Sequence, residues 1–288
     1  MHARAVPLDK IRQNLSGLWV DTTRRTYVEG GTAYIPVLDG YPYTHVIPER
    51  KRNGRGYQKI GDIIAFHGKK PDKDLVREVI ASHAPRGVIW YKTHQGNLRI
   101  PDCEVLWGET GEVIHREAGV VYRLDPTRVM FSQGNREEKI RLSGLVLPGE
   151  RVCDMFAGIG YFTLHLARAG ALVHAIELNP DACRFLESNV RENRLEDRVI
   201  ISAGDCRVHL AGVYDRIQMG HYDAADFLEK ALVHSRPGTV LHVHSVGDIR
   251  DRISSVLRES GYTGELSTRV IKKVGPGKEH MVTDVVIS

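Results

Sequence analysis

The sequence predicts an α/β fold, with a doubly wound and mainly parallel sheet that ends in an antiparallel hairpin, behind a smaller β-rich region. From about Val152 the chain alternates strand-like apolar runs with helix-like runs. Repeated β-α units with right-handed crossovers build a sheet of this kind. After Gly264 two strand-like runs follow each other, joined by the turn Gly275-Pro276-Gly277 and with no helix between them.

Five strand–helix pairs make up the alternation. The strands are RVCDMF, LVHAIEL, RVIISAG, DRIQMG and TVLHVHSV, and the runs that follow them are YFTLHLARAG, PDACRFLESNVREN, CRVHLAG, DAADFLEKALVHS and DIRDRISSVLRES. With the closing hairpin, this is the Rossmann-like layout of the seven-stranded AdoMet-dependent transferases. A plain dinucleotide-binding sheet is not expected to end in this way.

The chain before this sheet is more irregular. IGDIIAFHG reads as a short strand that ends in a turn, and the three-to-four spacing of apolar residues in DKDLVREVIASHA predicts a helix over 72–84. Three strand-like runs follow, at Val88–Lys92, Glu104–Trp107 and Val120–Leu124. We therefore expect a basic N-terminal region over 1–84, a β-rich segment over 85–130 and an AdoMet-binding domain over 131–288.

The composition indicates a reduced, cytoplasmic protein. In the 288 residues no apolar run is long enough to span a membrane, and MHARAVPLDKIRQNL lacks the apolar segment of a secretory signal. The four cysteines have no C-x-x-C spacing, which disfavours structural zinc and a disulfide framework and favours buried thiols; they are Cys103, Cys153, Cys183 and Cys206.

Positive charge is concentrated at the front of the chain. Residues 1–70 contain twelve Lys or Arg against six Asp or Glu, and the densest patch is PERKRNGRGYQK. Such a patch is either a polyanion-binding surface or a solvated loop. On the first interpretation, the nucleic-acid contacts are Arg50, Lys51, Arg52 and Arg55.

Three successive strand ends carry the signals of an adenosine-containing ligand. Gly158 and Gly160 in DMFAGIGYFT allow the backbone to turn tightly and approach a ligand closely. Glu177 ends the second strand, where a carboxylate can accept both ribose hydroxyls, and Asp205 with the amide of Cys206 can bracket an adenine edge. Taken singly, Glu177 could be a surface acid and Asp205 a helix cap. Together with the hairpin, these residues favour AdoMet over NAD.

The segments VMFSQGNREEKIRL, VCDMFAGIGYFTLHLARAGALVHAIELNPDACRFLESNVREN and ISAGDCRV resemble the archaeal and eukaryotic tRNA enzymes that act at guanosine 37. That family includes the guanosine-37 N1-methyltransferase and the wybutosine-synthesis aminocarboxypropyltransferase. The resemblance implies that Ser132 and Lys139 contact AdoMet. The family more often has arginine in place of Lys139, and lysine keeps the charge without the bidentate fork.

The two branches differ after the fourth strand. In the methyltransferase branch the sequence at this place resembles Asn-Leu/Pro-Pro. This chain has Met219-Gly220 instead, which is similar to the aminocarboxypropyl branch. We expect Gly220 to leave room beside the cofactor. That branch also has an H-x-H-like fifth strand, here His242 and His244, for which packing or a substrate hydrogen bond is favoured over a metal pair. His221 is either a substrate contact or a solvated loop residue, and the catalytic candidates are His221 and His244.

The resemblance implies transfer of the 3-amino-3-carboxypropyl group from AdoMet to 4-demethylwyosine at position 37 of tRNA(Phe), with release of methylthioadenosine and without a metal. The expected partner is the anticodon arm of tRNA(Phe), with Tyr41, Tyr43 and Tyr57 as candidates to stack on bases. No membrane and no obligate protein partner is indicated. The alternatives are a guanosine-37 N1-methyltransferase, a non-catalytic tRNA-binding protein and a small-molecule methyltransferase.

Overall fold

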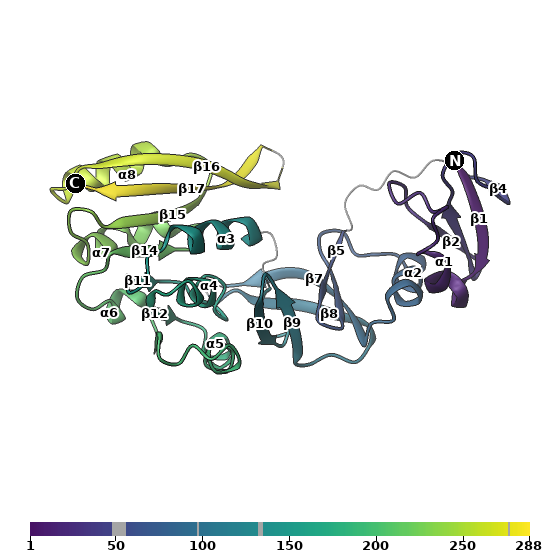
Figure 1. The fold of residues 1–288 in the computed structure, drawn as a ribbon, viewed down its shortest axis with the longest axis horizontal. Helices are drawn as coiled ribbons and strands as arrows, with labels where there is room; N and C mark the ends of the chain where they lie inside the picture. Colours follow the sequence, from purple (N-terminus) through teal and green to yellow (C-terminus); the bar gives the residue numbers. More distant parts are fainter. Residues whose placement is uncertain (48–55, 97, 132–134, 276) are drawn as a thin grey trace. The chain divides into compact units, whose positions relative to one another are not determined.

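The computed structural model describes residues 1–47, 56–96, 98–131, 135–275 and 277–288 (Figure 1). They divide into two compact units. The N-terminal unit comprises Met1–Val113 and Asp125–Met130, and the C-terminal unit comprises Ile114–Leu124 and Phe131–Ser288.

The N-terminal unit begins with a small antiparallel sheet of order β2-β3-β1-β4. Its strands are β1 (His2–Pro7), β2 (Tyr27–Glu29), β3 (Thr32–Pro36) and β4 (His45–Val46), and β1 is followed by η1 (Leu8–Lys10) and α1 (Ile11–Asn14). One small apolar core forms beneath this sheet, from Val6, Ile11, Val20, Val28, Ala33 and Ile35.

A second sheet of the same unit has the order β5-β6-β7-β8. Its elements are β5 (Tyr57–Ile60), β6 (Ile63–Phe66), α2 (Lys73–His83), β7 (Gly87–Gln95) and β8 (Ile100–Gly108). The helix expected over 72–84 is confirmed: Asp72 caps its start by accepting a bond of 2.8 Å from the Leu75 amide, and Ala84 ends it with a left-handed φ of 44°. Because α2 connects the parallel strands β6 and β7, the expected boundary at 84/85 falls inside one unit.

The C-terminal unit contains a seven-stranded sheet of order β13-β12-β11-β14-β15-β17-β16. Strands β11 to β15 are parallel, and β17 is antiparallel to both β15 and β16. The strands are β11 (Arg151–Asp154), β12 (Leu172–Glu177), β13 (Val199–Ala203), β14 (Arg216–Met219), β15 (Val240–Val246), β16 (Gly264–Gly275) and β17 (Lys278–Ile287). The predicted fold class, with its closing hairpin, is confirmed.

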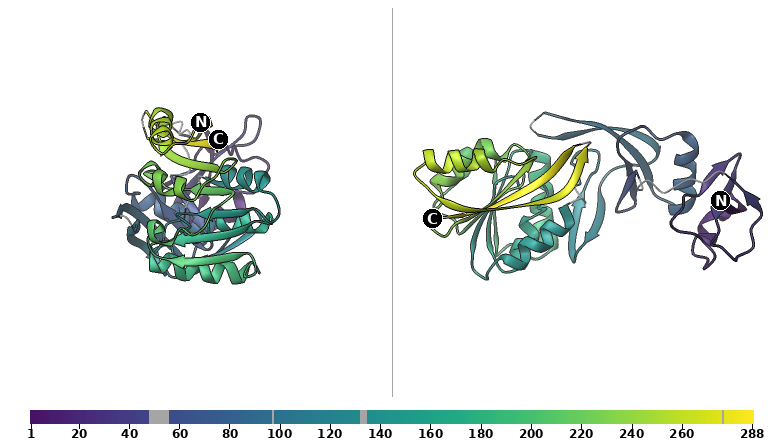
Figure 2. Two further views of the ribbon diagram at one scale, coloured as in Figure 1. Left: turned by 90° about the vertical axis from the view of Figure 1, so that its left-hand side faces the viewer. Right: turned by 90° about the horizontal axis from the view of Figure 1, so that it is seen from above.

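Helices cover both faces of this sheet (Figure 2). They are α3 (Arg136–Leu145), α4 (Thr163–Arg168), α5 (Pro180–Glu192), α6 (Cys206–His209), η3 (Ala224–Phe227), α7 (Leu228–Val233) and α8 (Arg250–Glu259). The main core lies between one face and α6, α7 and α8, where Ile217, Leu241 and Val285 are completely buried. In the described part of the chain, no helix is long and apolar enough to cross a membrane.

A separate hairpin of β9 (Val113–Glu117) and β10 (Val120–Leu124) packs on α5. Asn189 of α5 and Asn193, which caps the end of that helix, bond the β10 backbone as a neighbouring strand would. Asn189 Oδ1 accepts from the Arg123 amide at 2.6 Å, and Asn193 Oδ1 accepts from the Val121 amide at 3.0 Å. These side chains explain why Ile114–Leu124 belongs to the C-terminal unit, although we expected that domain to begin at residue 131.

Candidate active site

The carboxyl ends of β11, β12 and β13 lie next to one another in the sheet. The strand order reverses between β11 and β14, and ligands of doubly wound sheets bind at such a switch point. The predicted residues Gly158, Gly160, Glu177 and Asp205 all follow or end these three strands. The candidate active site is therefore assembled from neighbouring strand ends, as expected from the sequence.

Both glycines of the turn after β11 have left-handed backbone conformations. Gly158 has φ of 58° and Gly160 has φ of 100°. A Cβ on Gly158 would lie 2.6 Å from the Tyr161 ring, and one on Gly160 would lie 2.8 Å from Leu164. The turn thus requires glycine at both positions, for its conformation and for its internal packing.

Glu177 joins the end of β12 to the glycine turn. Its Oε2 accepts a bond of 2.6 Å from the Gly158 amide, and its Oε1 accepts one of 2.7 Å from the Asn179 amide. Burial raises the pKa of Glu177, and these amides oppose the rise. The Leu178 amide also lowers the Glu177 pKa. A carboxylate has about four lone-pair sites, so Glu177 keeps capacity to accept a further hydroxyl.

Asp205 and Cys206 stand at the start of α6. Asp205 caps this helix by accepting a bond of 2.9 Å from the Arg207 amide, and it forms an ion pair with the Arg207 side chain. These bonds lower the pKa of Asp205. The Cys206 side chain is buried in the main core, so only its backbone can reach a ligand.

Asp154, which sequence reasoning missed, ends β11 directly before the glycine turn. It is completely buried, and its Oδ2 accepts bonds from the Thr163 amide (3.1 Å) and hydroxyl (2.7 Å). Its Oδ1 has no hydrogen-bond partner among the described residues. Burial raises the pKa of Asp154 to about 6. The sequence could have indicated Asp154, because it is an acid at the end of a strand, as Glu177 is and as Asp205 nearly is.

Lys139 lies in α3, fully buried. Its ammonium is 2.7 Å from Glu117 Oε1 and faces the rings of Tyr122, Phe131 and Tyr161 at 5.3–5.6 Å. Burial lowers the pKa of Lys139 and Glu117 opposes the shift. The partner Glu117 was not expected from the sequence. Ser132 lies outside the described residues.

His244 is buried and neutral rather than exposed at the surface. Its Nε2 lies 2.8 Å from Gln218 Nε2, its Nδ1 lies 2.9 Å from His280 Nε2, and its ring packs edgewise on Phe162. Burial lowers the pKa of His244 well below its usual value. His221 is more exposed, with its ring 5.4 Å from that of Phe156 and its Nδ1 accepting a bond from the Asp223 amide.

His242 points to the same face of β15 and belongs to an ionic cluster. Its Nδ1 donates to Asp284 Oδ1 at 2.6 Å, and its Nε2 accepts from Arg216 at 2.7 Å. Arg141 and Arg269 also pair with Asp284. Among the described residues no group of His, Cys, Asp or Glu is arranged for a metal.

Gly220 directly follows β14. A Cβ there would lie 3.2 Å from the Phe162 ring and 3.4 Å from Gln218 Nε2. The space beside Gly220 is therefore filled by Phe162 and is not open as expected.

The residues expected to bind nucleic acid are less completely placed. Arg50, Lys51, Arg52 and Arg55 lie outside the described residues. Tyr41 and Tyr43 are exposed, with Tyr43 stacked on His2 at 3.9 Å. Tyr57 is half-buried and its hydroxyl is 2.9 Å from His83 Nε2.

Comparison with known proteins identifies the family. The TRM5/TYW2 methyltransferase domain matches residues 113–265. A tRNA(Phe) (4-demethylwyosine(37)-C(7)) aminocarboxypropyltransferase of Methanocaldococcus jannaschii is 35% identical over 243 residues, which are 80% of this chain and 97% of that protein. The chain belongs to the TRM5/TYW2 family.

Solved structures of both branches of the TRM5/TYW2 family resemble the chain. M. jannaschii TYW2 in complex with AdoMet has a TM-score of 0.66 at 31% identity, over 81% of this chain and 99% of that one. Pyrococcus abyssi Trm5b has a TM-score of 0.72 at 28% identity, over 99% of both chains. The fold alone therefore does not separate the two branches.

Proposed function

We propose that this chain transfers the 3-amino-3-carboxypropyl group of AdoMet to C7 of 4-demethylwyosine at position 37 of tRNA(Phe), releasing methylthioadenosine. The observation that carries this function is the 35% identity to the M. jannaschii aminocarboxypropyltransferase, which extends over 97% of that enzyme. The chain is thus an AdoMet-dependent tRNA-modifying enzyme, and it acts in wybutosine synthesis.

We further propose that AdoMet binds at the ends of β11, β12 and β13. The glycine turn, with Gly158 and Gly160, allows close approach of the backbone. Glu177 accepts the ribose hydroxyls, and Asp205 with the Cys206 amide contacts the adenine. The buried Oδ1 of Asp154, which has no partner in the described structure, supports a cationic group of AdoMet at the same place.

The transfer depends on which carbon of the sulfonium faces the acceptor. A bond forms between C7 of the base and Cγ of AdoMet while the Cγ–S bond breaks, its electron pair stays on sulfur, and C7 loses its proton. Since the sulfonium is a good leaving group, in-line positioning supplies most of the catalysis. His244 is buried, packs edgewise on Phe162 and bonds Gln218, so we assign it a supporting role and not that of the proton acceptor.

We propose that the enzyme binds the anticodon arm of the tRNA and that the basic N-terminal region makes most of the contacts. In this proposal the phosphates are bound by Arg50, Lys51, Arg52 and Arg55. Exposed Tyr41 and Tyr43 are candidates to stack on unpaired bases. We propose action in the cytoplasm without an obligate protein partner.

One observation favours a second candidate, a tRNA guanosine-37 N1-methyltransferase: Trm5b resembles the chain over its whole length, whereas TYW2 of M. jannaschii covers 81% of it. AdoMet labelled separately in the methyl and carboxyl groups decides between them. With tRNA(Phe) that carries 4-demethylwyosine, we expect carboxyl label in the RNA and one methylthioadenosine per transfer. Methyl label entering a tRNA with unmodified guanosine 37, without carboxyl label, would overturn the proposal.

A further inference from the structure

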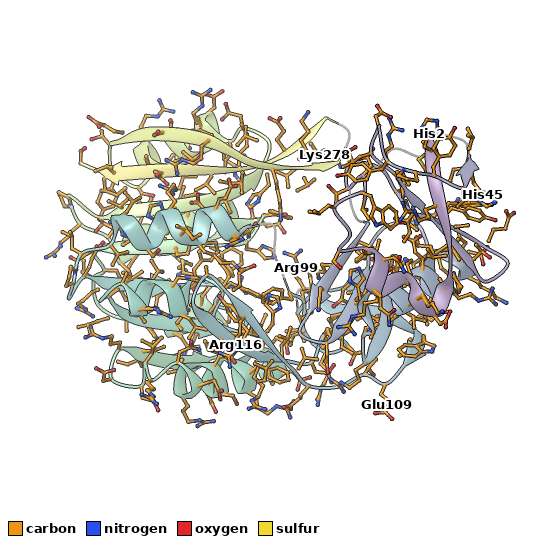
Figure 3. All side chains as sticks on the ribbon, turned by 45° about the vertical axis from the view of Figure 1, so that its right-hand side comes forward. His2, His45, Arg99, Glu109, Arg116 and Lys278 are labelled. Carbon is orange, nitrogen blue, oxygen red and sulfur yellow. The ribbon has the colours of Figure 1, made fainter. Side chains whose placement is uncertain are left out.

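Lys139 and Glu117 form an ion pair inside the C-terminal unit. The ammonium is completely buried, the Glu117 side chain is 9% exposed, and the two atoms are 2.7 Å apart. The neighbouring Arg116, labelled in Figure 3, is exposed on the same strand. A buried ammonium is costly without a counter-ion, so a carboxylate beside Lys139 is what keeps this side chain charged.

The pair borders the predicted cofactor site through direct contacts. The Tyr161 ring lies 5.5 Å from the Lys139 ammonium and also lies against Gly158, whose amide bonds Glu177. On the other side, Asn189 donates to the carbonyls of Ile159 in the glycine turn and Arg123 in β10. Hydrogen bonds and ring contacts thus link the glycine turn to the hairpin that carries Glu117.

The surroundings of the pair contain unused polar atoms. The Tyr122 hydroxyl and His165 Nε2 are both buried, and neither has a hydrogen-bond partner in the described part of the chain. The Tyr122 ring faces the Lys139 ammonium at 5.6 Å. Buried polar groups normally have a partner, so the described residues of this corner leave two polar atoms available to a further polar group.

We propose that Glu117 is a displaceable counter-ion, which holds Lys139 in the AdoMet-free enzyme and yields it to the carboxylate of AdoMet. This inference rests on the proposed function. Adding a second carboxylate beside Glu117 would bury an excess negative charge around one ammonium, whereas exchange conserves the balance. The amino group of AdoMet has a different candidate, the unpaired Oδ1 of Asp154.

The exchange distinguishes substrate from product. Methylthioadenosine lacks the aminocarboxypropyl group and therefore cannot take Glu117's place on Lys139. After transfer, Glu117 returns to Lys139, and the enzyme keeps no charge contact that retains the product. Lys139 thus favours AdoMet over methylthioadenosine, and Glu117 limits that preference because it competes with AdoMet for the same ammonium.

The test measures binding without tRNA, by calorimetry, so its outcome is independent of whether transfer occurs. In Glu117→Gln we expect AdoMet to bind about tenfold more tightly, because a charge-assisted bond no longer has to be broken. Binding of methylthioadenosine should change less than about twofold, within the usual effect of a remote substitution. Glu196→Gln, at an exposed position after α5, is the matched control and should change neither.

Two outcomes would overturn the proposal. Equal affinities of Glu117→Gln and wild type for AdoMet would mean that no exchange occurs. Weaker AdoMet binding would mean that Glu117 contacts the ligand, as a partner of its amino group. If Glu117→Gln does not fold, Glu117→Asp is measured instead, because the shorter carboxylate keeps the charge but reaches the Lys139 ammonium less well. AdoMet should again bind more tightly than to the wild type, and unchanged or weaker binding refutes the exchange.

Discussion

Asp154→Asn is expected to stabilise the ligand-free protein at neutral pH. The Asp154 carboxyl is fully buried, and its pKa is about 6 against an ordinary 3.8. Each unit corresponds to 1.36 kcal/mol, so ionising Asp154 at pH 7.5 costs the folded state about 3 kcal/mol. Because the folded pKa is raised, this contribution favours folding below pH 4 and is lost between about pH 4 and pH 6.

Asparagine keeps the shape and removes the ionisation. Its oxygen can accept the two Thr163 bonds, which leaves its amide donor unpaired at a cost of about 1–2 kcal/mol. The net gain at pH 7.5 is about 1–2 kcal/mol, or a rise in Tm of roughly 3–6 °C. Since the same substitution removes the proposed partner of a cationic group, AdoMet affinity should fall.

The assay is urea denaturation without ligand, from pH 4 to pH 8. The wild type should lose stability relative to Asp154→Asn as the pH rises from 4 to 6. Thr163→Val provides a control, because it removes a donor that lowers the Asp154 pKa and should extend the loss to higher pH. Parallel pH profiles for wild type and Asp154→Asn, or a less stable variant at pH 7.5, would refute the reasoning.

Three further substitutions test the packing around the site. Asp284→Asn leaves Arg141, Arg269 and His242 around a neutral side chain and should cost about 3 kcal/mol of unfolding free energy at pH 7, measured by urea denaturation. Because the pKa of Asp284 lies well below its usual range, the wild type should keep this stability above pH 4 and lose it only in strong acid. Gly220→Ala places a Cβ 3.2 Å from Phe162 and should cost about 1 kcal/mol and weaken AdoMet binding, whereas unchanged values of both would contradict the tight packing. Asn189→Ala leaves the Arg123 amide without its hydrogen bond and should cost about 2–3 kcal/mol of unfolding free energy. The matched Asn193→Ala, at a less buried position, should cost less, and equal losses would count against this account of the hairpin.

The sequence predicts those parts of the fold that depend on local pattern. The helix that begins after Asp72 has its cap and its apolar spacing within thirteen residues, and the β-α alternation after Val152 is equally local. The attachment of β10 to α5 could not be predicted, because Asn189 and Asn193 bond strand residues that lie 66–72 positions earlier. An asparagine on a helix gives no sign of such a partner.

Some residues of the candidate site could likewise be predicted from the sequence and others could not. Glu177 and Asp205 could be placed because the carboxyl ends of adjacent parallel strands meet at one edge of the sheet. The partners of the buried charged residues could not be predicted, because they depend on how distant segments pair. Asp284 reaches His242 only because β17 pairs antiparallel with β15. Glu117 reaches Lys139 across 22 residues of chain. The sequence shows which residues can ionise but not which of them neutralise each other.

The region after β14 shows how a glycine can be required by its neighbours. Met219-Gly220 distinguishes the chain from the proline-containing loop, and the Gly220 backbone lies against Phe162, which in turn packs on His244. His244 is fixed by Gln218, and Phe162 stands between Tyr161 and Thr163, which contact Lys139 and Asp154. A side chain at position 220 would therefore press on the segment that joins both proposed contacts of the AdoMet amino-acid moiety. Gly220 is thus required by the Phe162 ring that packs against it, and the packing of Phe162 in turn holds that segment in place.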